Sequence, residues 1–222
     1  MRKSSKIGAG AGIAALLIAG VIGASSVANA APVHQASSSK VTTPVAAVPA
    51  LFGGNTAVAL DANFLAALKS LKLTPGVVGT ATLTDGSIHF PITGGDVVYW
   101  SPKGSYRPYV QGIILHEGSG LSLTAGKTKV ELTNFTVNPG NSMLYGDVSV
   151  NGKVAAAQAP LFNLYGGTLK PLELSGNDAI LTGTTVHLSA TAAGLLDQVF
   201  KTTAVKSQLL IGVATITAQI SK

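Results

Sequence analysis

Cysteine is absent from all 222 residues of this sequence. Its absence excludes disulfides, thiolate metal sites, a cysteine nucleophile and a lipid-modified cysteine at a cleavage site. Charge is also scarce, because Asp, Glu, Lys and Arg together make up 11% of the chain. Such a chain depends on its apolar core for stability, and 46% hydrophobic residues over this length can supply one.

The first thirty residues have the layout of a secretory signal peptide. Residues 1–6 are basic without an acid, residues 7–21 form an apolar run, and Ala28-Asn29-Ala30 offers a small-x-small cleavage site. The run is short and glycine-rich for a membrane span of about 20 residues, although an uncleaved anchor is the alternative. We expect residues 1–30 to be removed and the protein to be secreted. The alternative is that the secreted protein stays associated with the cell surface. The mature chain contains no other apolar run that predicts a transmembrane segment.

Removal of this leader leaves 12 Lys and Arg against 9 Asp and Glu, a net charge of about +3. Arg107 is the only arginine that remains, and the lysines are scattered along the chain. Nucleic-acid binding generally requires a basic patch in which arginines make bidentate contacts. The composition therefore argues against a nucleic acid as partner.

The mature chain divides into a linker and one domain. Residues 31–49 mix Ser, Thr, Ala and Pro without periodicity, which predicts a flexible linker. Residues 50–222 predict a single β-rich domain. Two-residue hairpin signals occur at 85–86 (Asp-Gly) and 151–152 (Asn-Gly), and a third turn is expected around 125–127. Such turns join antiparallel strands, so we predict an all-β fold, a mostly antiparallel sandwich or barrel.

Two short helices are expected within this fold, over residues 62–71 and 190–200. Each follows a short strand and a good N-cap residue, Asp61 or Ser189, and each precedes a similar strand. This similarity indicates either an internal duplication or two units that converged independently. In both cases we expect the two ends of the domain to pack near each other.

The sequence contains no motif of a catalytic or metal site. His116-Glu117 begins like a zinc-protease motif, but no second histidine follows four residues later. Nucleophile elbows, phosphate loops and calcium loops are not found either. We therefore predict that the protein is not an enzyme, with no catalytic residues and no metal site. An undetected hydrolase is the remaining enzyme alternative.

The segment 99–109 is the one local anomaly in composition. It holds three of the five tyrosines, the only tryptophan and Arg107, together with two prolines. Aromatic side chains and arginine on a loop are typical of a binding surface, but the same residues could fill the mouth of a sandwich. The candidate ligand-binding residues are Trp100, Ser105, Tyr106, Arg107, Tyr109 and, further on, His116.

Over residues 55–217 the chain resembles a group of exported actinobacterial proteins, through 90–95 (FPITGG), 118–122 (GSGLS) and 146–148 (GDV). It also distantly resembles the Htaa domain of actinobacterial haem-uptake proteins. Trp100 and the run Ser105-Tyr106-Arg107-Pro108-Tyr109 reproduce that family's spacing of Trp followed by Ser-Phe-Arg-x-Tyr. This resemblance implies haem as the candidate cofactor, with Tyr109 as iron ligand and Ser105 helping to hold the haem.

The family's histidine is not matched in the same way. It lies much farther along the chain than His116, which follows Tyr109 by seven residues. At about 3.3 Å per residue in one strand, these two would lie some 20 Å apart and on opposite faces. The leading hypothesis is therefore a secreted, non-enzymatic β-sandwich that acts at the cell surface as a structural or ligand-binding module. Its partner would be an unknown surface ligand or envelope component, and haem binding is the alternative.

Overall fold

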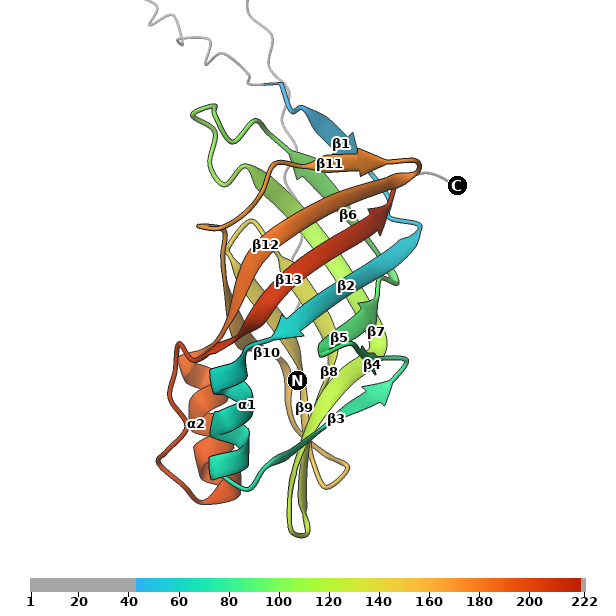
Figure 1. Cartoon of the computed structure of the whole chain (residues 1–222). Coiled ribbons are helices and arrows are strands. Elements are labelled where there is room, and N and C mark those ends of the chain that lie inside the picture. Colours follow the sequence, from blue (N-terminus) through green and yellow to red (C-terminus); the bar gives the residue numbers. More distant parts are fainter. Residues whose placement is uncertain (1–42, 221–222) are drawn as a thin grey trace, which may run out of the picture. The chain divides into compact units, whose positions relative to one another are not determined.

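A computed structural model describes residues 43–220 (Figure 1). The predicted leader, residues 1–30, and residues 31–42 of the predicted linker lie outside the described residues. The elements are β1 (Ala46–Val48), β2 (Gly53–Leu60), α1 (Ala62–Ser70), β3 (Thr74–Gly79), β4 (Thr82–Thr84), β5 (Ser87–Pro91), β6 (Gly94–Tyr99), β7 (Val110–Ala125), β8 (Thr128–Asn138), β9 (Met143–Val150), β10 (Lys153–Tyr165), β11 (Glu173–Ser175), β12 (Asp178–Leu188), α2 (Ala190–Phe200) and β13 (Leu210–Gln219). The predicted class, mostly antiparallel β with two short helices, is confirmed.

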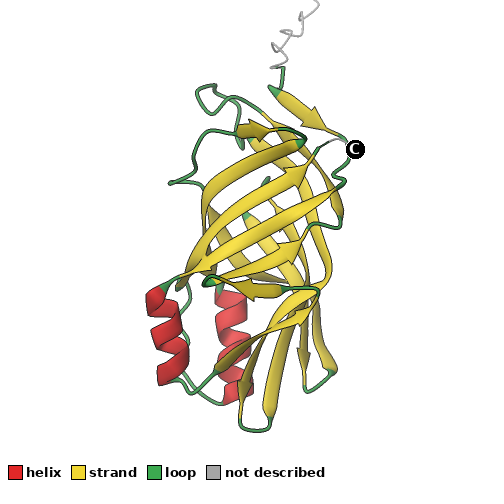
Figure 2. Cartoon of the chain, turned by 45° about the vertical axis from the view of Figure 1, so that its right-hand side comes forward, coloured by secondary structure: helices red, strands yellow, loops and turns green. Residues whose placement is uncertain are grey.

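The described strands belong to one sheet, in which all pairs are antiparallel. The order is β1-β6-β7-β8-β9-β10-β12-β13-β2-β5-β4, with β11 beside β12 and β3 beside β7. The sheet curls, so that β5, near one end of this order, also contacts β7, near the other end (Figures 1 and 2). This single curled sheet replaces the two facing sheets that the sandwich of the leading hypothesis requires.

The hairpin turns have the backbone geometry that their sequences predict. Asp85 and Gly86 have φ of 50° and 74°, and Asn151 and Gly152 have φ of 49° and 77°. Both residues of such a turn must adopt positive φ, which Asn, Asp and Gly tolerate best. The first turn joins β4 to β5, and the second joins β9 to β10.

Two boundaries differ from the sequence expectation. Residues 46–48, inside the predicted linker, form β1 and pair with β6. The stretch before the Asp85-Gly86 hairpin turn is not one continuous strand, because it is divided at Gly79, whose φ of +64° turns the chain. As a result β3 pairs with β7, whereas β4 pairs with β5.

The helices begin where the N-cap residues predict. The Asp61 carboxylate accepts hydrogen bonds from the backbone N–H groups of Asn63 and Phe64, at 2.8 and 3.2 Å. The Ser189 hydroxyl accepts one from Ala192 at 3.0 Å. Both helices lie at one end of the sheet (Figures 1 and 2), and neither is long and apolar enough to span a membrane. The strands that precede them, β2 and β12, flank β13, so the two ends of the domain pack together as expected.

A line of β-bulges crosses neighbouring strands in the middle of the sheet. The register shifts between β7 and β8, between β8 and β9, and between β9 and β10. Asn134 and Gln158 lie in two of these bulges with φ of 53° and 44°. Each donates a hydrogen bond of 2.9 Å to the carboxylate of Asp147 on β9, Asn134 from its side chain and Gln158 from its backbone. Bulges bend strands and increase their twist, so this network favours the curl of the sheet.

One hydrophobic cluster extends through the interior of the sheet and under the helices. Between α2 and the sheet it is closely packed: Leu161 is fully buried, and the gap lined by Leu161 and Leu196 holds only about 20 Å³. The interior of the curled sheet itself is filled much less completely.

Candidate ligand-binding site

The curled sheet encloses a cavity of about 320 Å³, which we call the interior cavity. Every described strand except β3 and β4 contributes to its lining. Most of the lining side chains are apolar, such as Val58, Phe90 and Leu181. Cavities that bind small molecules typically measure about 300–1,000 Å³, so the interior cavity has the size of a ligand site.

The cavity follows from strand number and from the size of inward-facing side chains. A closed sheet of about 8 strands has an interior that side chains can just fill, whereas the main path of this sheet has more strands. On β13 the inward positions include Ala214 and Ala218, which are 4% and 6% exposed. These small side chains leave space that leucine or phenylalanine would occupy.

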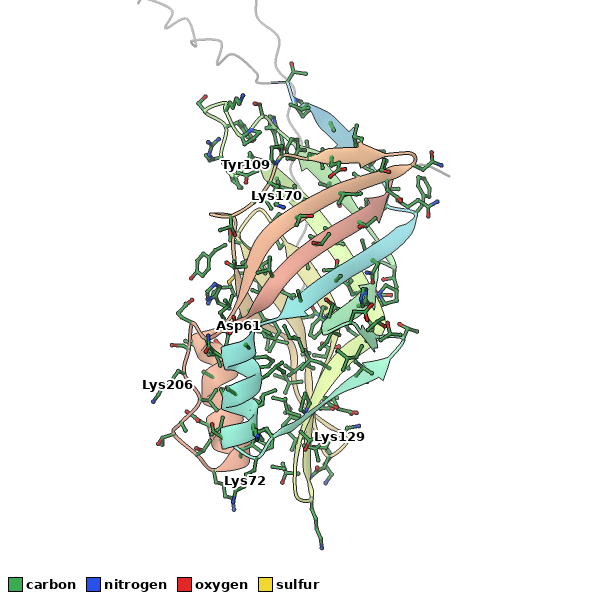
Figure 3. The ribbon with its side chains drawn as sticks, in the orientation of Figure 1. Asp61, Lys72, Tyr109, Lys129, Lys170 and Lys206 are labelled. Atoms are coloured by element: carbon green, nitrogen blue, oxygen red, sulfur yellow. The ribbon has the colours of Figure 1, made fainter. Side chains whose placement is uncertain are left out.

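One end of the cavity is bordered by two loops, which together we call the mouth. The first loop contributes Arg107, Pro108 and Tyr109, and the second, between β10 and β11, contributes Gly166 and Leu169. Tyr109 lies at the end of the sheet away from the helices, whereas Asp61 lies where α1 begins (Figure 3). The mouth and the helices are therefore at opposite ends of the sheet.

The second mouth loop is held against β12 by Gly183. Its φ is +108°, and a Cβ there would lie 2.2 Å from the carbonyl oxygen of Thr168. Only glycine allows this close approach. The Thr168 hydroxyl donates a hydrogen bond of 2.7 Å to the Gly183 carbonyl, and Lys170 N–H donates one of 2.8 Å to the carbonyl of Thr182.

The Arg107 side chain is folded back onto its own loop. Its Nη1 donates hydrogen bonds to the carbonyl oxygens of Gly104 and Tyr106, both at 2.8 Å, and its Nη2 donates one to that of Pro102 at 2.9 Å. The guanidinium carbon also lies 5.5 Å from the centre of the Tyr109 ring. These contacts fix a positive charge at the mouth of an apolar cavity.

Tyr109 places a phenol beside this charge. Its ring contacts the ring of Tyr99 edge-on, with centroids 6.1 Å apart. Burial raises the pKa of Tyr109, the neighbouring Tyr99 raises it further, and the Arg107 charge opposes both effects. The phenol is therefore protonated at neutral pH and can donate a hydrogen bond.

The other three candidates of the aromatic segment are not part of the cavity lining. The rings of Trp100 and Tyr106 stack on each other, with centroids 4.4 Å apart and an interplanar angle of 23°. Trp100 is half-buried, Tyr106 is 38% exposed and Ser105 is exposed. The structure thus brings Arg107 and Tyr109 together at the mouth and places Trp100, Ser105 and Tyr106 on the outside of the same loop.

His116 lies inside the cavity rather than at the mouth. It is 1% exposed, and its Nε2 is 2.8 Å from the hydroxyl oxygen of Thr56. Among residues 43–220 its Nδ1 has no hydrogen-bond partner, although the backbone of Phe135 is close enough to affect its titration. Burial lowers the pKa of His116 to about 4, against a smaller opposing effect of Phe135. The imidazole is therefore neutral at pH 7.

The expectation that Tyr109 and His116 face opposite sides is wrong. Both line the interior cavity, because Tyr109 precedes the first residue of β7, Val110, and does not follow the alternation of the strand. Within residues 43–220, no group of three or more His, Asp or Glu is placed to hold a metal ion.

Sequence reasoning did not identify the cavity lining or the second mouth loop. Alternation along β2 and β12 indicates which side chains point inward, but it does not distinguish a packed interior from an open one. Gly183 is conspicuous only as a glycine in a run of strand residues. The pairing of Thr168 with Gly183 cannot be read from spacing alone.

No protein-family model matches this chain, and no curated protein matches it. Among solved structures, the C-terminal domain of HtaA from Corynebacterium glutamicum has a TM-score of 0.51 and 15% identity, with coverage of 78% of this chain and 99% of that one. The haem-binding protein HtaB from the same organism has a TM-score of 0.44 and 13% identity, with coverage of 77% and 94%. At such low identity the likeness to the HtaA domain is one of fold, and it confirms the resemblance noted in the sequence.

Proposed function

We propose that this chain is a secreted, non-enzymatic binding module that holds the apolar part of a small ligand inside its curled sheet. The observation that carries the proposal is the interior cavity of about 320 Å³ with its mostly apolar lining. Side chains around an empty apolar space lack contacts on one side, so an apolar molecule that fills it gains those contacts. Binding to the folded state alone also stabilises the protein.

The predicted leader supports a site of action outside the cytoplasm. We propose that cleavage after Ala30 releases the mature chain, which begins at Ala31 and meets its ligand, or an envelope component that carries it, at the cell surface. N-terminal sequencing of the exported protein tests this point. A mature protein that retains residues 1–30 would contradict it.

A neutral fluorescent apolar probe, Nile red, tests cavity binding. We expect saturable binding with one site per chain, and loss of that binding in Ala214→Leu, which places a larger side chain on the cavity wall. Ala193→Leu is the matched control, because Ala193 is equally buried but does not line the cavity. Equal binding by wild type and Ala214→Leu, or no binding by either, would contradict the proposal.

Haem is a second candidate ligand. It is favoured by the fold shared with the HtaA domain and by the position of the Tyr109 phenol at the mouth. Tyr109 would hold the iron, and a bound haem would supply a ferric centre for which an anionic phenolate is a suitable ligand. The fit is partial. The raised pKa of Tyr109 disfavours the phenolate. The groups described in contact with the Tyr109 ring are the Tyr99 ring and the Arg107 guanidinium, not a histidine.

Titration of the purified chain with haemin decides between the two candidates. If haem binds through Tyr109, a saturable Soret shift should appear in wild type and in the control Tyr145→Phe, and should be lost in Tyr109→Phe. A titration without a Soret shift would exclude haem as a ligand. It would not contradict the binding of Nile red in the cavity.

A further inference from the structure

We propose that the ligand of the interior cavity is a single-chain amphiphile with an anionic headgroup. Its chain would lie inside the sheet, and its headgroup would meet Arg107 and Tyr109 at the mouth. This inference rests on the proposed function and specifies the chemistry of the ligand.

Charge at the cavity is confined to one residue. Arg107 is the only Lys, Arg, Asp or Glu among the lining residues. The salt bridge found among residues 43–220 joins Lys129 to Glu131, and Lys129 lies at the opposite end of the sheet from Tyr109 (Figure 3). No carboxylate within the described part of the chain therefore forms an ion pair with Arg107. Arg107 is itself exposed, at the rim of the cavity. A fixed cation at the edge of low-dielectric space attracts a ligand anion more strongly than a cation in open water does.

The mouth also keeps hydrogen-bond donors for such an anion. A guanidinium has five N–H donors, and three of those of Arg107 donate to the carbonyls of Pro102, Gly104 and Tyr106. The remaining two have no partner among the described residues. The loop carbonyls hold the guanidinium in place, so little side-chain freedom is lost when an anion binds. The protonated phenol of Tyr109 offers a further donor.

The interior, by contrast, offers no place for a second charge. Thr56 and the neutral His116 are paired with each other, and the other lining groups in the depth of the cavity are mostly apolar. A volume of about 320 Å³ is near the lower limit for ligand sites, which leaves room for one chain rather than several. A ligand that satisfies both parts of the site has one anionic head and one apolar chain.

Calorimetric titration with four probes that share a dodecyl chain tests the inference. The probes are dodecanoate, dodecyl phosphate, dodecanol and dodecyltrimethylammonium, each kept below its micelle concentration. We expect both anions to bind at least about tenfold more tightly than dodecanol, and the cation to bind most weakly, because hydrogen bonds to a charged group are stronger than those to a neutral one. The two anions distinguish a carboxylate ligand from a phosphate ligand without affecting the inference.

Arg107→Gln should abolish the preference for anions over dodecanol. Lys103→Gln removes a cation from the same loop without touching the lining and should preserve it. Because Arg107→Gln also removes loop contacts, Arg107→Lys is included: it keeps the charge and should restore much of the preference. If all four probes bind equally, or if Arg107→Gln keeps the preference for anions, the proposal of an anionic headgroup is contradicted. The proposal that the cavity binds a ligand is not affected by that result. If no probe binds to wild type, cavity binding itself fails.

Discussion

The Nε2 atom of His116 lies 2.8 Å from the Oγ1 atom of Thr56, within a mostly apolar interior. The two residues are 60 positions apart in the sequence and belong to β7 and β2. Their contact joins two strands that lie near opposite ends of the strand order, so it depends on the tertiary fold and reports on it.

This pair predicts a loss of stability in mild acid. Burial lowers the pKa of His116 to about 4, whereas an unfolded histidine titrates near 6.5. Between these values the unfolded state binds a proton that the folded state does not, so the free energy of unfolding should fall as pH is lowered. The fall is at most about 3 kcal/mol and should be complete near pH 4. Urea unfolding at pH 7.5 and pH 4.5 measures it.

The variant His116→Gln serves as the control for this prediction. It removes the titrating group, so its free energy of unfolding should depend less on pH over the same window. An equal pH dependence in wild type and His116→Gln would show that His116 does not titrate as its burial implies.

Filling the interior cavity should not destabilise the fold. In Ala214→Leu the three added carbons enter empty space, and burial of each is worth about 0.8 kcal/mol, so we expect the free energy of unfolding to rise by up to about 2 kcal/mol. In Ala193→Leu the same carbons enter the packed region around α2 and should cost about 1–3 kcal/mol. Thermal and urea unfolding compare the two. Equal destabilisation would mean that the interior is packed and holds no ligand.

The aromatic loop separates into an outer stack and the mouth. Tyr106→Ala should change the free energy of unfolding by less than about 1 kcal/mol, because the ring is exposed and its main contact is Trp100. A double-mutant cycle with Trp100→Ala should give a coupling of about 0.5–1.5 kcal/mol. Leu161→Ala, a fully buried reference, should cost about 2–5 kcal/mol. If Tyr106→Ala lowered the free energy of unfolding as much as Leu161→Ala, the result would show that the loop is packed as part of the core.

The Asp147 carboxylate should stabilise the bulged strands. Hydrogen bonds from the Asn134 side chain and then from the Gln158 backbone lower its pKa. Its contribution is therefore present above the pKa of an unfolded aspartate, near 3.9, and is lost as pH falls through the lower pKa of the folded state. Asp147→Asn should cost about 1 kcal/mol at pH 7. Asp178→Asn on β12 is the matched control in the same unfolding assay, and equal effects would contradict this role.

Gly183 should be required for the order of the second mouth loop. In Gly183→Ala the new Cβ would meet the Thr168 carbonyl at 2.2 Å with φ at +108°, and we expect a cost of about 1–3 kcal/mol. Limited proteolysis should cut residues 166–172 faster in this variant. Gly167→Ala, whose Cβ would meet nothing within 4 Å, should behave like wild type. Unchanged proteolysis in Gly183→Ala would show that the loop is held elsewhere.

Local chemistry made much of this fold predictable from sequence. Asp85-Gly86 and Asn151-Gly152 predict antiparallel hairpins because few residue pairs adopt positive φ twice in succession. Asp61 and Ser189 predict helix starts because their side chains satisfy free backbone N–H groups. The cluster of Arg107 and Tyr109 was visible in the composition of residues 99–109. Each of these features depends on residues within a few positions of one another.

The interior cavity and its mouth were decided only by the tertiary structure. Alternation shows that Val58 and Ala214 face one side of their strands, but whether that side is filled depends on how many strands curl together. Likewise, Tyr109 shares a cavity with His116 because the strand begins at Val110, and Thr168 meets Gly183 because a loop folds back onto β12. Sequence determines the local preference of each segment, whereas the enclosed volume is a property of all the strands together.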